Sequence, residues 1–172
     1  FFLLSLIFLL VNTEFCYADQ NQDVLILNSY HKSFKWTDDQ VSSIQKVIKN
    51  NLKSTEIYIE YMDTKRIYNP EYLAELRDMY RLKYKPTNLD TIITTDDNAL
   101  RFALQHHEQI FGGAPISFCG INNYREHLIT KHPKATGIVE VLDIKETLDL
   151  IFKVHPQTHT IVVVVEIGRA HV

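Results

Sequence analysis

The sequence predicts an α/β fold built on a parallel, doubly wound sheet. Short apolar segments alternate along the chain with segments of helical periodicity, and short connections join them. Strands that alternate with helices in this way pair in parallel through right-handed crossovers. Residues 57–61 alternate apolar and polar side chains, which is typical of a half-exposed edge strand. These patterns together predict the strand order 2-1-3-4-5.

The individual elements are predicted from apolar runs and from the residues that start and stop helices. Strands are expected at 24–27, 57–61, 89–94, 115–119, 137–141 and 161–165. Helices are expected at 37–49, 69–85, 98–110 and 143–154. Thr37 and Gln40 have the spacing of a capping box, and Asn69 precedes Pro70 as a cap precedes a first-turn proline. The buried helix faces are expected to contain Val41, Ile44, Val47, Ile48, Leu73, Leu76, Met79 and Tyr80.

Both ends of the chain are expected to lie outside the first folded unit. Residues 1–11 are almost wholly apolar, and small residues at Cys16 and Ala18 precede Asp19 in the manner of a cleavage site. This pattern predicts a signal peptide at 1–18, truncated at its start, with a buried helix or an uncleaved membrane anchor as alternatives.

Three further segments complete the expected organisation. Residues 19–142 are expected to form a first α/β lobe, and residues 143–165 a crossover helix and the first strand of a second lobe. The tail at 166–172 has no structural pattern and resembles the translation of a sequencing adapter. An ordinary frayed tail is the alternative.

The composition of the chain limits the kinds of molecule that it is expected to bind. The chain is 45% hydrophobic and 23% charged, as in an ordinary globular protein. Its formal net charge of −3 gives no electrostatic reason to expect nucleic acid as a partner. If the leader is removed with Cys16, Cys119 is the only cysteine and no intrachain disulfide forms.

Polar and aromatic residues follow the predicted strands, at the edge where an open α/β sheet binds its ligands. The candidate ligand-binding residues are Ser29, Tyr30, Phe34, Trp36, Asp63, Thr64, Thr95, Asp96, Asn98, Asn122 and Asn123. Other interpretations stay open. The acids after the third strand cap a helix in one of them, Phe34 and Trp36 form a hydrophobic staple in another, and Asp63 lies in a solvated loop in a third.

Six motifs in order give the chain a more specific resemblance. They are Leu27-Asn28-Ser29-Tyr30-His31, Trp36-Thr37-Asp38-Asp39, the segment 60–66, the segment 95–102, the segment 118–123 and the segment 136–140. In this order the motifs resemble the ABC-transporter substrate-binding-protein-like family, which includes the periplasmic sensor domains of bacterial histidine kinases and related signalling proteins. The resemblance spans about residues 23–165.

The resemblance implies a type I periplasmic-binding fold, in which two α/β lobes close on a small ligand. It implies an extracytoplasmic location and either a membrane signalling module in the same chain or an ABC permease as partner. The sensor role is the favoured expectation, and the transporter receptor is the alternative. An amino acid is the expected ligand type, since acidic side chains suit its amine and the amides at a helix N-terminus suit its carboxylate.

Enzyme and cofactor motifs are weak by comparison. Asp96-Asp97 lacks the acid pair that a receiver domain places after its first strand, where Asn28-Ser29 stands instead. Cys119 has no nucleophile-elbow sequence around it, and the histidines lack metal-ligand spacing. No glycine-rich phosphate loop is present. We therefore expect no catalytic residues, no metal and no cofactor.

Overall fold

The computed structural model describes residues 21–140 and 143–164. The predicted leader at 1–18 and the predicted tail at 166–172 lie outside the described residues.

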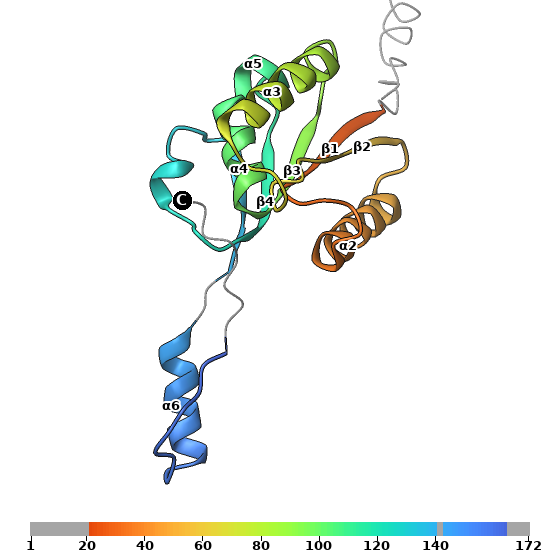
Figure 1. Ribbon diagram of the computed structural model, residues 1–172. Coiled ribbons are helices and arrows are strands. Elements are labelled where there is room, and N and C mark those ends of the chain that lie inside the picture. The colour runs from red at the N-terminus through yellow and green to blue at the C-terminus, as the bar shows by residue number, and fades with distance from the viewer. Residues whose placement is uncertain (1–20, 141–142, 165–172) are drawn as a thin grey trace, which may run out of the picture.

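The lobe is built on a five-stranded parallel sheet with the order β2-β1-β3-β4-β5 (Figure 1). Its strands are β1 (Gln22–Asn28), β2 (Thr55–Tyr61), β3 (Thr91–Thr95), β4 (Ile116–Ile121) and β5 (Ala135–Val139). The α/β class and the predicted strand order are therefore confirmed. β2 lies at the edge, as its alternating sequence indicates, and β1 lies between β2 and β3.

Helices cover both faces of this sheet (Figure 1). One face is covered by α2 (Lys35–Asn51). The other face is covered by α3 (Pro70–Tyr84), α4 (Asp96–Gln105) and α5 (His107–Phe111). Later in the chain come the short 3-10 helix η1 (Glu126–Leu128) and the helix α6 (Ile144–Val154). Within the described part of the chain, no helix has the length and apolar character needed to cross a membrane.

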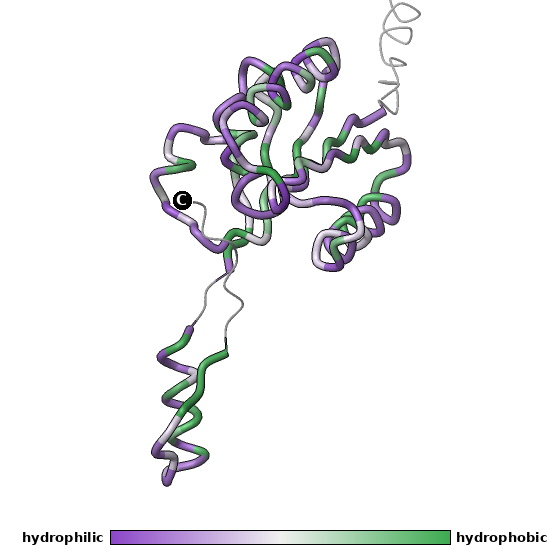
Figure 2. Tube along the Cα trace, viewed as in Figure 1, coloured by the Kyte–Doolittle hydropathy of each residue, from purple (hydrophilic) through white to green (hydrophobic). Residues whose placement is uncertain are grey.

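The largest part of the core lies between the sheet and the three helices α3, α4 and α5. Leu25 and Leu27 of β1 belong to one buried cluster with Tyr80 and Tyr84 of α3 and Leu100 of α4. Figure 2 shows apolar residues in the strands and a mixture of polar and apolar residues along the helices. The continuous apolar run in β1 is buried on both faces, as expected for a central parallel strand.

Two helices begin earlier than predicted. α2 begins at Lys35, so Thr37 is fully buried inside the helix and does not cap it. The turn before α2 is stabilised instead by Asp38, whose carboxylate accepts a hydrogen bond from the Ser33 amide at 3.1 Å. α4 begins at Asp96, which has a left-handed φ of 65° and turns the chain directly from β3 into the helix.

The helix ends and the apolar faces are partly as predicted. The Asn69 side chain accepts a hydrogen bond from the Tyr72 amide and caps α3, and Gly112 ends α5 in the left-handed conformation. Met79 and Val47 are exposed rather than buried, because they lie at the margin of their helices' apolar stripes.

The segment after β5 differs most from the prediction. α6 begins after the predicted cap Asp143 and ends as predicted, but it buries none of its residues and lies apart from the sheet (Figure 1). Residues 161–164 form no strand, because none of the other described residues pairs with them. The strand predicted at 161–165 is therefore not observed over these residues.

Candidate functional site

The loops after β1 and β3 meet at the carboxyl edge of the sheet. The chain crosses from β1 to β2 in one direction and from β2 to β3 in the other, which makes this edge the topological switch point where open α/β sheets bind ligands. Ser29 follows β1 and donates its hydroxyl hydrogen to the Thr95 carbonyl of β3 at 2.7 Å. We call the surface around this junction the crevice.

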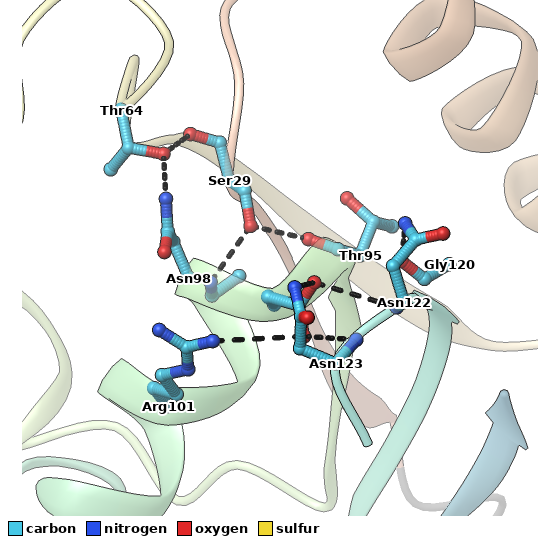
Figure 3. A network of polar contacts seen from close by, with 10 residues as sticks. Ser29, Thr64, Thr95, Asn98, Arg101, Gly120, Asn122 and Asn123 are labelled. Carbon is cyan, nitrogen blue, oxygen red and sulfur yellow. Dashed lines mark hydrogen bonds and ion pairs between the residues drawn. The ribbon is translucent and has the colours of Figure 1, made fainter. Parts of the chain in front are cut away.

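Four of the predicted site residues bond to one another beneath the crevice (Figure 3). Ser29 also accepts a hydrogen bond from the Ala99 amide at 2.8 Å. Thr64 donates to the Ser29 carbonyl at 2.6 Å, and Asn98 donates to the Thr64 hydroxyl at 3.0 Å. Thr95 donates to the Asn28 side chain at 3.0 Å. All of these side chains are buried, so they join the strand ends together and offer little surface to a ligand.

Asp96 is the most unusual group of the crevice. It is 3% exposed and accepts a hydrogen bond from the Trp36 indole at 3.1 Å through one oxygen. Its other oxygen is buried and has no hydrogen-bond partner among the described residues. Burial, followed by the nearby charges of Glu140 and Asp97, raises the pKa of Asp96 to about 7. Burying a carboxyl group costs free energy when one of its oxygens has no hydrogen-bond partner, unless another group supplies the missing hydrogen bond.

Aromatic side chains stand beside Asp96. Trp36 leaves 45% of its surface exposed while its indole nitrogen reaches Asp96. Tyr30 packs edge-on against Phe34 at 5.6 Å, and burial together with the charges of Asp96, Asp97 and Glu140 raises the pKa of Tyr30 to about 12.

Charged residues from the loop after β2 lie near these aromatic side chains. Asp63 adopts a left-handed φ of 52° and lies 3.4 Å from both His31 and Arg66. The Lys65 ammonium lies 3.9 Å from the centre of the Phe34 ring. This geometry supports the solvated ion-pair interpretation for the Asp63–Arg66 contact and makes the aromatic ring of Phe34 a neighbour of a cation.

Asn122 and Asn123 lie further along the edge and contact Asp97. The Asp97 carboxylate accepts hydrogen bonds from both backbone amides, at 3.4 Å and 3.2 Å, and lies 3.9 Å from Arg101 (Figure 3). These contacts connect the loop after β4 to the first turn of α4. The two asparagines therefore lie at the predicted edge, but their hydrogen bonds hold the loop after β4 against α4.

Three contributors to the crevice were not among the predicted ligand-binding residues. Gln40 of α2 has a buried side-chain oxygen without a partner among the described residues. Gly120 has a φ of 71°, and a β-carbon there would lie 3.2 Å from the Asp96 side chain and 2.9 Å from that of Gln40. Glu140 follows β5 and acts on the Asp96 pKa through its charge. The signal available for Gln40 was its position one turn after Trp36 on the same helix.

A cavity of about 470 Å³ lies outside the crevice, between α3 and α4, and Asn98 is the one predicted site residue among those that line it. Among the described residues, no group of three or more histidine, cysteine or acidic side chains is arranged to hold a metal ion. Burial raises the pKa of Cys119, which keeps its thiol protonated.

The fold and the edge define an α/β lobe with a parallel sheet and a polar, partly acidic crevice at its switch point. Comparisons with protein-family models, with curated proteins and with solved structures find no match.

Proposed function

We propose that this chain contains the first lobe of an extracytoplasmic ligand-binding domain of the type I periplasmic-binding-protein class, acting as the sensor of a bacterial membrane signalling protein of the histidine kinase type. Its role in this proposal is binding rather than catalysis. The observation that carries the proposal is the unpartnered oxygen of buried Asp96 beside the exposed ring of Trp36, at the switch point of the sheet.

The proposed ligand is a small, amino-acid-like molecule whose amine lies against Asp96. An ammonium group supplies hydrogen-bond donors to the unused carboxylate oxygen and favours the ionised form of Asp96. The aromatic rings of Trp36 and Tyr30 add attractive surface for a cation. The Ala99 amide is already bonded to Ser29, so the carboxylate of the ligand is proposed to bind residues of the opposing lobe.

The segment after β5 supports the two-lobe part of the proposal. α6 has one strongly apolar side, yet Ile144, Leu150 and Val154 are all exposed. An amphipathic helix of this kind is normally stabilised by packing its apolar face against another element. A second lobe would provide that surface.

A ligand screen on the purified protein tests the binding site. Thermal shift and calorimetry are measured with amino acids, amines, sugars and inorganic anions. Compounds with an amine are expected to stabilise the protein, and Trp36→Ala and Asp96→Ala are expected to weaken their binding. Asp39→Asn is the matched control, because Asp39 lies on the exposed side of the same helix turn and pairs with Lys35. Stabilisation by sugars alone, or equal binding by both variants and the parent, contradicts the proposed site.

The alternative function is a solute-binding receptor of an ABC transporter, in which two lobes would close on the ligand in the same way. The two roles differ in the coding sequence downstream of the ligand-binding domain. An apolar span of about 20 residues followed by a cytoplasmic module supports the sensor. A stop codon after a second lobe, next to permease genes, supports the transporter receptor.

A further inference from the structure

The cavity between α3 and α4 forms a groove on the face of the protein that these two helices cover, next to the crevice. Its volume of about 470 Å³ falls in the range of small-molecule sites. The residues that line it are Tyr68, Asn69, Pro70, Leu73, Ala74, Arg77, Asn98, Arg101, Phe102, Gln105 and His106. Of these, Asn98 alone belongs also to the network beneath the crevice.

The two walls of the groove are regular helix stripes. On α3 the lining positions 70, 73, 74 and 77 lie on one face, and on α4 the positions 98, 101, 102 and 105 do the same. α3 packs closely against α5 rather than against α4. Ala74 contributes a short side chain to the α3 wall, and Phe102 of the α4 wall packs edge-on against Tyr80 at 5.7 Å.

The lining carries positive charge without an acidic side chain among its residues. Arg77 enters from α3 and Arg101 from α4. Arg77 directs Nε and one terminal nitrogen to Asp78 at 3.0 Å, so its other terminal nitrogen keeps its donors. Arg101 lies 3.9 Å from Asp97, beyond hydrogen-bond distance, and that carboxylate is occupied by the backbone amides of the β4 loop.

The positive charge of Arg77 also affects His106, which lines the same groove. Burial, followed by the charge of Arg77, lowers the pKa of His106. The ring of His106 lies 4.6 Å from that of Phe102, so the two rings form a continuous part of the lining. The lowered pKa disfavours the charged form of His106, and the two arginines supply positive charge to the groove.

We propose that the groove is a second binding site, specific for a small organic acid with an apolar or aromatic body. The carboxylate of this ligand lies between Arg77 and Arg101, whose planar guanidinium groups suit a carboxylate geometrically. The apolar body covers Leu73, Ala74 and Phe102. Gln105 offers an amide to any further polar group of the ligand.

The test uses the full chain and phenylacetate as the probe, with 3-methylbutanoate as a smaller acid and phenylacetamide as the uncharged analogue. Binding is measured by calorimetry. Both acids are expected to bind at concentrations below about 10 mM, and phenylacetamide is expected to bind about tenfold more weakly or worse. Arg77→Gln and Arg101→Gln are each expected to weaken phenylacetate binding about tenfold. Arg81→Gln, on α3 but outside the groove, is the matched control and is expected to retain binding.

Ala74→Leu provides a test that leaves the charges in place, because it fills the open centre of the groove. It is expected to abolish phenylacetate binding while Trp36→Ala leaves it unchanged, which separates this site from the crevice. The proposal is overturned if neither acid binds, if phenylacetamide binds as well as phenylacetate, or if Ala74→Leu retains full binding. Binding of an acidic peptide without binding of either small acid also overturns it.

Discussion

Replacing Asp96 by asparagine is expected to stabilise the protein, and the gain is expected to grow as the pH rises. Asparagine keeps an oxygen that accepts the Trp36 indole hydrogen bond, tolerates the left-handed backbone at this position and cannot ionise. The substitution therefore removes the buried charge with little other change.

The direction of the pH dependence follows from the raised pKa of Asp96. In the folded state this pKa is about 7, against the ordinary value of 3.8. Between these values the folded protein binds more protons than the unfolded chain, so stability is greatest at low pH and is lost as the pH rises to about 7. The full loss is roughly 4 kcal/mol, at about 1.4 kcal/mol for each pH unit of difference. Between pH 5 and pH 8 the advantage of asparagine over aspartate is expected to widen by roughly 3 kcal/mol.

Urea unfolding followed by far-UV circular dichroism measures this difference at the two pH values. Asp39→Asn serves as the control, because Asp39 is exposed and its pair with Lys35 is expected to contribute little to stability at either pH. An asparagine variant that is less stable than the parent at pH 8, or an advantage that stays constant with pH, would refute the buried-charge argument.

Three further substitutions test the edge and the core by the same unfolding measurement. Ser29→Ala is expected to destabilise the fold by about 1–3 kcal/mol, because the Ala99 amide loses its partner, whereas Ser117→Ala at an exposed site is expected to change little. Gly120→Ala is expected to cost about 1–3 kcal/mol, since it combines a positive φ with a close approach to Asp96; equal stability would contradict the tight packing. Tyr80→Phe is expected to be neutral or stabilising, because its buried hydroxyl group has no partner among the described residues, and a loss above about 1 kcal/mol would contradict this.

The matched substitution for the last of these is Tyr84→Phe, one turn further along α3. Tyr84 donates its hydroxyl hydrogen to Glu60 at 2.5 Å. Its loss is expected to destabilise the protein by about 1–3 kcal/mol, because the donor to a partly buried carboxylate disappears. The opposite signs expected for the two tyrosines separate the hydroxyl contribution from that of the ring.

The architecture of the sheet could be predicted from the sequence because each strand has its own local pattern. The continuous apolar run in β1 and the alternating residues of β2 determine which strand is central and which lies at the edge. The start of α2 could not be predicted in this way. Thr37 and Gln40 have capping spacing, but the helix extends past them because their side chains are buried against the sheet edge, which is a tertiary effect.

The sequence correctly predicted that several candidate residues lie at one edge of the sheet, but it did not predict which of their side chains are free. Sequence position brings Ser29, Thr64 and Thr95 to one edge, and the structure places them there. Their hydrogen bonds are satisfied by one another across loops that are far apart in the sequence, and no sequence pattern reveals such pairing. The unused oxygen of Asp96 is equally hidden from the sequence, because it depends on the position of Trp36 and on the burial produced by the whole edge.

The first turn of α4, together with the residues that directly follow it, belongs to both proposed sites, which constrains how they are built. Asp96 faces the crevice, Asn98 bonds to Thr64 beneath it and also lines the groove, and Arg101 projects into the groove. The position of this turn is set by Ser29, which bonds to the Ala99 amide and to the β3 carbonyl before it. Ser29→Ala is therefore expected to disturb both binding sites, whereas Ala74→Leu changes the groove alone. Loss of crevice binding in Ala74→Leu would show that the two sites are not separable in the way the geometry of α4 requires.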